Sequence, residues 1–593
     1  MESMGNLRRT HYSCRLGKNN VGEEVVVAGY IAKVRDLGAV VFCDVRDTKG
    51  VIQIKFGDDC AAETLEKAKT LRTEYVVLAK GVVEEREKAN PNLETGSIEI
   101  KVSELKILSE AETTPFEIKD DVNVKDELRL KYRYLDLRRT KAHEGLVLRH
   151  KVAKITRDYF DQNDFMEIET PMLVKSTPEG ARDYIVPSRV QPGRFFALPQ
   201  SPQLYKQLLM LSGFDRYMQI VRCFRDEDLR ADRQPEFTQI DVEMAYVDEI
   251  DVQTVNEGFI KRVFKEVLDV DVPTPFVRMK YQEAMDRYGV DKPDTRFGLE
   301  LVDIKEQVKH TEFAVFKSAL DNGGSVRCIN AKGLADKLTR KEIDKLVEIA
   351  KTYGAKGLAY TRLTSESETS SYEKFLTGDV IREVREKVDA KTGDVILVVA
   401  SEDSDVVYAA LGALRLDIAK KFKLFDPDQF NFLWVTDFPL FEYDKEDKRF
   451  VAMHHPFTMP KEEDIQYINS DPGRCHAKAY DMVLNGVELG GGSIRITNPE
   501  LQRKMFHTLG FTEQRMQDSF GFLIEAYRYG APPHGGMAYG LDRLCMLMAK
   551  KESIRDVIAF PKVQNAGELM TGCPDVVETK QLNELSIALQ DIK

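Results

Sequence analysis

The N-terminal part of the chain alternates short hydrophobic, β-branched runs with polar turns, a pattern typical of strands. Five runs predict strands, at residues 24–33, 39–44, 51–56, 75–83 and 97–107. Residues 61–72 have helical spacing and lie between the third and fourth runs. Three strands, a helix and two strands are the order of a five-stranded OB barrel, a fold that commonly binds single-stranded nucleic acid or sugars.

The remainder of the chain changes its pattern twice. Helices alternate with strands from residue 146 to about 277, and a strand-rich pattern with glycine-rich turns occupies residues 430–561. Residues 279–424 form a separate α+β pattern, with amphipathic helices at 340–353 and 405–422. We therefore expect one antiparallel α+β domain that is interrupted by an insertion. The predicted parts are a barrel, a hinge, the first half of the main domain, the insertion, and the second half with a C-terminal extension, at residues 1–112, 113–145, 146–280, 281–425 and 426–593.

The composition is that of a globular protein, because 42% of the 593 residues are hydrophobic and 31% are charged. No apolar run approaches the ~20 residues of a membrane helix, and the N-terminus lacks the apolar core of a secretory signal. The eight cysteines are scattered without a CxxC pair, so neither a zinc finger nor a disulfide framework is predicted. We expect a reducing, cytoplasmic location and no membrane contact.

The formal charge of −12 argues against a protein coated in nucleic acid. One stretch departs from this acidity, because residues 128–157 contain ten Lys or Arg and only two acids. A solvated helical face and a contact with a nucleic-acid backbone both fit such a stretch, and both interpretations stay open.

Three separated blocks set cationic side chains among short polar motifs on predicted strands. In the first block, Arg225 precedes a polar loop and Phe237 follows it, so a strand–loop–strand pairing puts them on facing strands. An arginine there can bind a phosphate or carboxylate through two hydrogen bonds, and an aromatic ring can stack on a purine. A surface hairpin with ion pairs is the alternative for this block alone.

The other two blocks are rich in glycine. In residues 534–544 a helix begins near Leu541, and Arg543 in its first turn opposes the helix dipole, which suggests an anionic partner. In residues 479–495, Asp481 and Glu488 flank an Asn-Gly hairpin turn, and Arg495 follows a triple glycine. Paired carboxylates of this kind can hold Mg²⁺ through oxygen ligands. The alternatives are a glycine-rich turn with a surface arginine and an acid pair that faces solvent.

Together these blocks resemble the class II aminoacyl-tRNA synthetases. Arg225, Glu227 and Phe237 are similar to motif 2 of that class, and Gly540-Leu541-Asp542-Arg543 is similar to motif 3. A helix followed by Phe165-Met166-Glu167-Ile168-Glu169-Thr170-Pro171 resembles motif 1, the dimer-interface element. Within the class, the barrel, the insertion and four segments resemble the bacterial type of aspartyl-tRNA synthetase, at residues 176–183, 200–206, 224–227 and 452–456. The resemblance covers essentially the whole chain.

This resemblance implies a homodimer that uses ATP and Mg²⁺ in two steps. L-Aspartate attacks the α-phosphate of ATP to give aspartyl-adenylate, and the 3′ end of tRNA(Asp) then accepts the aspartyl group. Three alternatives are a relaxed enzyme that also charges tRNA(Asn), an ammonia-dependent asparagine synthetase on the same catalytic fold, and a non-catalytic paralogue. The barrel argues against the second and the retained charged residues against the third. We favour strict aspartate specificity.

The resemblance also assigns roles, with Arg225 and Arg543 as the catalytic residues. The implied ATP site comprises Arg225, Asp226, Glu227, Gln234, Phe237, Glu488, Gly540, Leu541, Asp542 and Arg543, and the implied Mg²⁺ ligands are Asp481 and Glu488. The implied aspartate site comprises Glu179, Ser201, Gln203, Lys206, Arg225, Asp241, His454 and Arg495.

Two cations of this set match a side-chain carboxylate. Neutral asparagine would leave Lys206 and Arg495 unpaired, and mismatches of this kind give discrimination of order 10⁴–10⁵. For His454 and its neighbour His455, a pair with one core-facing and one exposed ring is the alternative interpretation.

In this family the barrel binds the anticodon loop. The resemblance therefore implies that Phe42 stacks on an unpaired base and that Arg35 and Gln53 contact base edges or phosphates. Leu37, between Arg35 and Phe42, is also placed to touch the anticodon. The alternation of the strand leaves open whether Phe42 lies in the barrel core instead.

Overall fold

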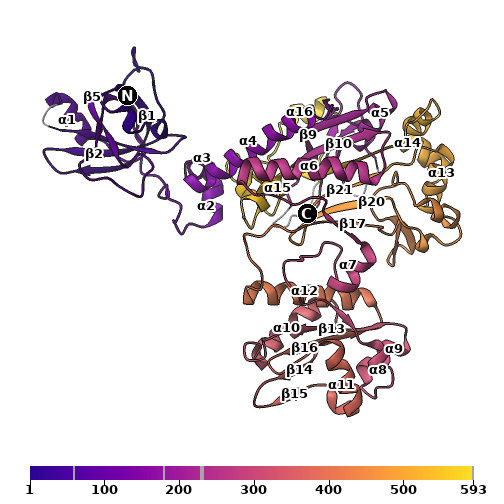
Figure 1. The fold of residues 1–593 in the computed structure, drawn as a ribbon. Helices are drawn as coiled ribbons and strands as arrows, with labels where there is room; N and C mark the ends of the chain where they lie inside the picture. Colours follow the sequence, from indigo (N-terminus) through magenta and orange to yellow (C-terminus); the bar gives the residue numbers. More distant parts are fainter. Residues whose placement is uncertain (58–59, 178–180, 228–232, 591–593) are drawn as a thin grey trace. The chain divides into compact units, whose positions relative to one another are not determined.

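The computed structural model describes residues 1–57, 60–177, 181–227 and 233–590. It divides into two compact units, Met1–Lys141 and Ala142–Lys593, each of which has its own core (Figure 1). In the described part of the chain, no helix combines the length and apolarity needed to cross a membrane.

The first unit contains the predicted barrel. Its five strands close in the order β1-β2-β3-β5-β4, with the strands β1 (Glu24–Asp36), β2 (Val41–Arg46), β3 (Val51–Phe56), β4 (Val76–Glu85) and β5 (Ile98–Ser109). Helix α1 (Ala62–Lys69) lies between β3 and β4 in the chain. The predicted order of elements is confirmed, and strand boundaries differ by only a few residues.

Strand β2 settles which face of the barrel Phe42 occupies. Val41, Cys43 and Val45 are buried in the barrel core, whereas Phe42 is only partly buried and lies outside that core. Because successive side chains of a strand point to opposite faces, Phe42 points away from the interior. The interpretation of Phe42 as a core residue is wrong.

The basic stretch begins in the last part of the same unit, at α2 (Asp126–Lys131) and α3 (Arg133–Asp136). Arg129, Arg133 and Arg139 all donate to the fully buried carboxylate of Asp136. Burial alone would raise the pKa of Asp136, but the hydrogen bonds from these arginines lower it below its ordinary value. Much of the local positive charge is therefore used inside the protein and is not displayed to a nucleic acid.

The second unit is built on an eight-stranded sheet in the order β11-β17-β20-β21-β22-β10-β9-β6. All neighbours are antiparallel except the two edge pairs, β11–β17 and β6–β9. The strands are β6 (Met166–Glu167), β9 (Arg216–Phe224), β10 (Glu236–Ala245), β11 (Val277–Lys280), β17 (Phe432–Thr436), β20 (Ala479–Leu484), β21 (Val487–Ile494) and β22 (His534–Gly540). The predicted antiparallel α+β domain is confirmed.

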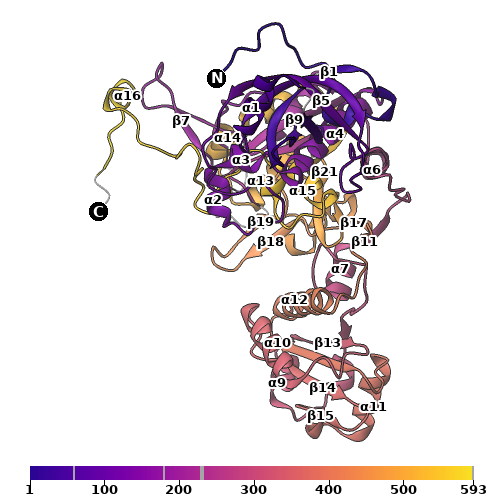
Figure 2. The same ribbon diagram turned by 90° about the vertical axis from the view of Figure 1, so that its left-hand side faces the viewer.

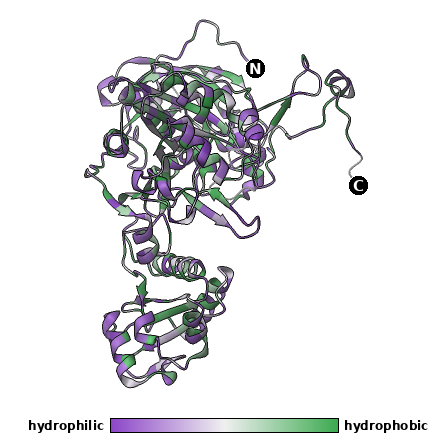
Figure 3. Cartoon of the chain, turned by 90° about the vertical axis from the view of Figure 1, so that its right-hand side faces the viewer, coloured by the Kyte–Doolittle hydropathy of each residue, from purple (hydrophilic) through white to green (hydrophobic). Residues whose placement is uncertain are grey.

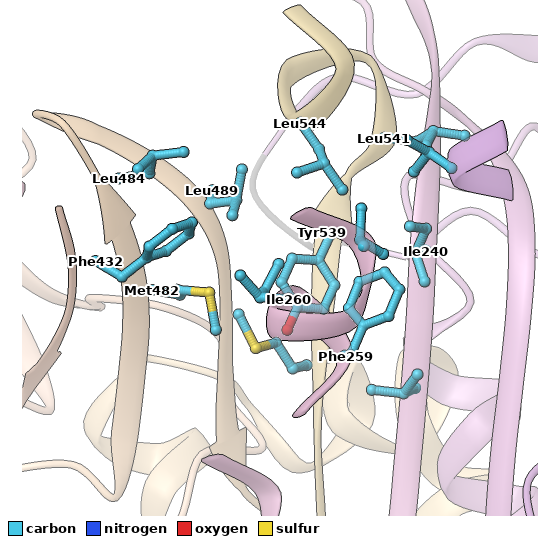
Figure 4. Close-up of a cluster of buried hydrophobic side chains, with 14 of the residues drawn as sticks. Ile240, Phe259, Ile260, Phe432, Met482, Leu484, Leu489, Tyr539, Leu541 and Leu544 are labelled. Atoms are coloured by element: carbon cyan, nitrogen blue, oxygen red, sulfur yellow. The ribbon is translucent and has the colours of Figure 1, made fainter. Parts of the chain in front are cut away.

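One face of this sheet packs on helices to form the main core. Figure 4 shows Phe259 and Ile260 of α6 (Glu249–Leu268) against Ile240 of β10 and Tyr539 of β22. The remaining helices and strands of this domain are α4 (Thr140–Asp161), α5 (Gln203–Leu211), α7 (Tyr281–Tyr288), α13 (Pro499–Thr508), α14 (Glu513–Tyr527), α15 (Leu541–Met548), α16 (Thr579–Glu584), β7 (Ile185–Pro187), β8 (Phe195–Ala197), β18 (Phe441–Asp444) and β19 (Arg449–Ala452). On the opposite face, β17 and β20 carry a second apolar cluster that includes Leu433, Val435 and Val483, whereas β10 carries the buried acids Asp241 and Glu243 there.

The insertion is a three-layer α/β/α unit. Its ribbon is drawn in Figures 2 and 3. Val395, Leu397 and Val399 face one buried cluster, and Ile396 and Val398 face another, so the central strand is buried on both sides. Its sheet has the order β12-β13-β16-β14-β15, with the strands β12 (Val302–Asp303), β13 (Ser325–Ala331), β14 (Ala359–Leu363), β15 (Glu368–Ser370) and β16 (Val395–Ser401). Its helices are α8 (Lys305–Val308), α9 (Ala314–Asp321), α10 (Arg340–Thr352), α11 (Gly378–Lys387) and α12 (Ser404–Phe422).

Candidate active site

The first block forms the predicted strand–loop–strand. Arg225 directly follows β9, Phe237 lies on β10, and the guanidinium carbon of Arg225 is 5.2 Å from the centre of the Phe237 ring. Nε of Arg225 is buried and has no hydrogen-bond partner among the described residues. A buried donor of this kind is costly unless an acceptor fills it, so the geometry suits an anionic ligand beside a flat ring.

A cavity of about 230 Å³ lies beside this pair. It brings together most of the predicted nucleotide residues, namely Arg225, Glu227, Gln234, Phe237, Glu488, Gly540, Asp542 and Arg543. Arg543 also donates to the backbone oxygen of Glu488 at 2.7 Å, which ties α15 to β21 across the cavity.

Two members of the predicted nucleotide set, Asp226 and Leu541, are not among the residues that line this cavity, and Gln234 lines it but has its side-chain amide engaged elsewhere. Leu541 is buried in the main hydrophobic core, and the Asp226 carboxylate lies 3.9 Å from Arg182. The side-chain amide of Gln234 exchanges two hydrogen bonds with the backbone of Lys562. The side chain of Leu541 therefore belongs to the core, and Gln234 holds the chain that follows α15.

The Asn-Gly hairpin forms as predicted, because Asn485 and Gly486 have positive φ angles of 52° and 84° between β20 and β21. A Cβ at Gly491 would meet one oxygen of Asp481 at 2.4 Å and one of Glu488 at 3.9 Å. A glycine at position 491 therefore leaves the space in which the carboxylates of Asp481 and Glu488 converge. Burial, followed by the charge of Asp481, raises the pKa of Glu488.

This carboxylate pair fits a hard cation, which prefers oxygen ligands and relieves the repulsion between two acids. Among residues 1–57, 60–177, 181–227 and 233–590, no three His, Cys, Asp or Glu side chains form a metal-holding group. Phosphate oxygens and water would have to complete the coordination.

The region predicted to bind aspartate contains an alternating array of buried charges. Nζ of Lys206 on α5 lies 2.7 Å from the Asp241 carboxylate and 3.3 Å from that of Glu243. Arg495 donates to both carboxylate oxygens of Glu243, at 2.8 and 3.0 Å. The four side chains are at most 3% exposed. Attraction to the buried cations lowers the pKa of Glu243 to about 2 even though burial opposes this, while burial raises that of Asp241 to about 6.

Glu243 is the residue that the sequence interpretation missed. On β10, Ile240, Val242 and Met244 face the main core, so Asp241 and Glu243 share the opposite face. A Cβ at Gly536 on the neighbouring strand would lie 2.0 Å from the Glu243 carboxylate, so that glycine makes room for it. Two acids at alternate positions of an otherwise apolar strand were the available signal.

Two neighbouring histidines also face this region. Although burial opposes it, the Asp481 carboxylate, 3.7 Å away, raises the pKa of His454, and its Nδ1 is buried without a partner among the described residues. Nε2 of His455 accepts a hydrogen bond from Arg495 at 2.7 Å, and burial lowers the pKa of His455 well below its ordinary value. Neither ring is exposed, so the interpretation with one outward ring is wrong.

The other predicted aspartate residues are distributed around the pocket. Gln203 is buried, and its side-chain nitrogen has no partner in the described part of the chain. Ser201 lines an adjacent, mostly apolar cavity of about 270 Å³. Glu179 lies outside the described residues.

The predicted anticodon residues form one cluster on the barrel. The guanidinium of Arg35 is 5.7 Å from the centre of the Phe42 ring and donates to the side-chain oxygen of Gln53. Gln53 is almost fully buried. Its side chain also accepts a hydrogen bond from Arg86 and donates one to Glu99. Arg86 and Glu99 join the cluster through pairing between distant segments, which a linear pattern does not report.

Comparison with known proteins agrees with these features. Residues 25–108 match the OB-fold nucleic acid binding domain, and residues 125–564 match the class II tRNA synthetases (D, K and N). The fold is similar to that of the asparaginyl-tRNA synthetase of Pyrococcus horikoshii, solved with asparaginyl-adenylate, at a TM-score of 0.59 and 18% identity over 94% of this chain and 98% of the other. The chain therefore belongs to the class II tRNA synthetases.

Similarity to full-length relatives narrows the family. The chain is 59% identical to the aspartate–tRNA ligase of Ruminiclostridium cellulolyticum over 99% of both chains. It is 55% identical, also over 99% of both chains, to the aspartate–tRNA(Asp/Asn) ligase of Caldanaerobacter subterraneus. Within its class, the chain belongs to the aspartate–tRNA ligase family.

Proposed function

We propose that this protein activates L-aspartate with ATP and transfers it to tRNA(Asp). The observation that carries the proposal is the buried array of Lys206, Arg495, Asp241 and Glu243 beside the cavity of Arg225 and Phe237. The substrate carboxylate is itself the nucleophile, so the protein has to align it and stabilise the charge that develops on phosphorus.

Each part of the site has a task in this reaction. Arg225 binds the α-phosphate and the reacting carboxylate, and the adenine lies between Phe237 and Arg543. Asp481 and Glu488 would hold Mg²⁺, which supplies charge neutralisation at the phosphates. Lys206 and Arg495 provide only donors to the substrate side chain, so the amide group of asparagine would meet donors where aspartate offers an acceptor. We further propose a homodimer through motif 1 and a cytoplasmic location.

Charging of purified tRNA(Asp) and tRNA(Asn), side by side, tests this function. We expect aspartate to be attached to tRNA(Asp) and far more slowly to tRNA(Asn). The relatives that are named aspartate–tRNA(Asp/Asn) ligases support the second candidate, a relaxed enzyme. Comparable rates for the two tRNAs would establish that candidate. Formation of asparagine from ammonia without tRNA would instead reveal an asparagine synthetase.

Replacing Phe42 with alanine is expected to weaken tRNA charging and to leave aspartate-dependent ATP–pyrophosphate exchange intact. The ring lies outside the barrel core, and stacking on one base is worth roughly 1–3 kcal/mol. Charging kinetics and exchange rates, measured on the same preparation, check this outcome. Equal loss of both activities would contradict the proposed contact with the anticodon, and Val41→Ala in the core of the same strand controls for barrel stability.

A further inference from the structure

The carboxylate of Asp542 joins three elements of the catalytic domain. It accepts a hydrogen bond from the backbone nitrogen of Thr238 on β10 at 2.9 Å, and its other oxygen accepts from Arg149 on α4. Arg149 also donates to the side-chain oxygen of Thr238 at 3.0 Å, which closes a triangle. Asp542 is 3% exposed, so these contacts are made away from bulk water.

The triangle lies where the strand ladder stops. The pairing of β10 with β22 ends at Gln239 and Gly540, so the Asp542 side chain continues the ladder by accepting from the next backbone nitrogen. Immediately beside these two residues in the chain are Phe237 and Arg543, both of which line the nucleotide cavity. The bond from Thr238 to Asp542 therefore ties the backbone next to Phe237 to the helix turn that carries Arg543.

Arg149 acts from the other side of the sheet. Phe237 and Gln239 line the nucleotide cavity, whereas Thr238 between them is buried and, with Arg149, is absent from its lining. The guanidinium of Arg149 neutralises the Asp542 carboxylate and orients it. A buried carboxylate without a cation would be strongly destabilised. A third contact of Arg149, to the backbone oxygen of Val557 at 3.5 Å, reaches the chain beyond α15.

We propose that Arg149 is a positioning residue for the nucleotide site, holding Phe237 and Arg543 at the spacing that adenine requires. It acts through Asp542 and Thr238 and touches neither substrate. The proposal rests on the function proposed above, and it adds a requirement for the first helix of the domain in ATP binding.

The test compares the full-length protein with Arg149→Gln, Arg149→Lys and the control Lys154→Gln in ATP–pyrophosphate exchange. Lys154 lies on the same helix and pairs with Asp158 on the surface of that helix. We expect Arg149→Gln to raise the KM for ATP on the order of tenfold and to leave the KM for aspartate within about twofold. The KM for ATP of Arg149→Lys should lie between those of the wild type and Arg149→Gln, because lysine keeps the charge but loses the hydrogen bond to Thr238. Lys154→Gln should match the wild type.

A double variant adds a further criterion. Asp542→Asn should raise the KM for ATP, and adding it to Arg149→Gln should change little more, because both remove the same contact. Equal rises in both KM values, a fall in kcat at an unchanged KM for ATP, or a lower melting temperature with unchanged kinetics would each overturn the proposal.

Failure of the proposed function is distinguishable from failure of this inference. A wild type without aspartate-dependent exchange would contradict the function. In that event, calorimetric binding of ATP to the wild type and to Arg149→Lys still decides the role of Arg149, since weaker nucleotide binding in the variant supports it and equal binding overturns it.

Discussion

Arg225→Ala is expected to lower aspartate-dependent ATP–pyrophosphate exchange by 10²–10³-fold, the usual effect of removing one well-placed charge contact from a transition state. Nε of Arg225 is buried without a partner in the described part of the chain, and its guanidinium carbon is 5.2 Å from the centre of the Phe237 ring. The side chain is thus prepared for an anion beside a stacked base, and alanine offers neither donor nor charge.

Two further variants separate the role of Arg225 from a general effect on the protein. Arg225→Lys keeps the charge but cannot make two parallel hydrogen bonds, so it should recover only part of the activity. Arg216→Gln removes an arginine from the other end of β9, where it donates to the backbone oxygen of Asn163 at 2.7 Å. That control should change thermal stability but not exchange. Exchange that is unaffected in Arg225→Ala would remove the assigned role.

Local patterns in the sequence predict the architecture well. The barrel follows from β-branched runs with one intervening helix, and the hairpin of β20 and β21 follows from Asn485 and Gly486, which accept positive φ angles. The continuous apolar run around Val395 fits a strand that is buried on both faces. These features depend on the residues themselves and on their near neighbours in the chain.

Features that depend on distant pairing could not be predicted in the same way. The charge of the basic stretch suggested a free surface, yet Arg138 pairs with Glu74, and Arg149 pairs with Asp542. Glu243 is close in sequence to Asp241, but its partner Arg495 lies more than two hundred residues away. A linear pattern reports burial and periodicity, and it does not report which charges meet across a sheet.

Glu243→Gln is expected to lower kcat/KM for aspartate on the order of 10²-fold and to leave the KM for ATP nearly unchanged. Glutamine keeps the shape of the side chain but turns one acceptor oxygen into a donor. In place of Oε2, that donor would face both the ammonium of Lys206 at 3.3 Å and the guanidinium of Arg495 at 3.0 Å, and in place of Oε1 it would face Nε of Arg495 at 2.8 Å. Arg495 then loses its two-point anchor, and the two cations are left with one carboxylate between them.

The same change should destabilise the fold, since breaking a buried ion pair by removing one partner costs about 3–5 kcal/mol. Glu257→Gln is the matched control, because Glu257 is also buried and paired with an arginine, Arg278 at 3.5 Å, and because an amide oxygen can keep the bond that it accepts from the indole nitrogen of Trp434. If both variants lowered the melting temperature and left the KM for aspartate unchanged, Glu243 would serve stability alone. A loss of aspartate affinity that is confined to Glu243→Gln would instead show that aspartate binding depends on the hydrogen bonds that hold Arg495 in position, as well as on the charge of Arg495.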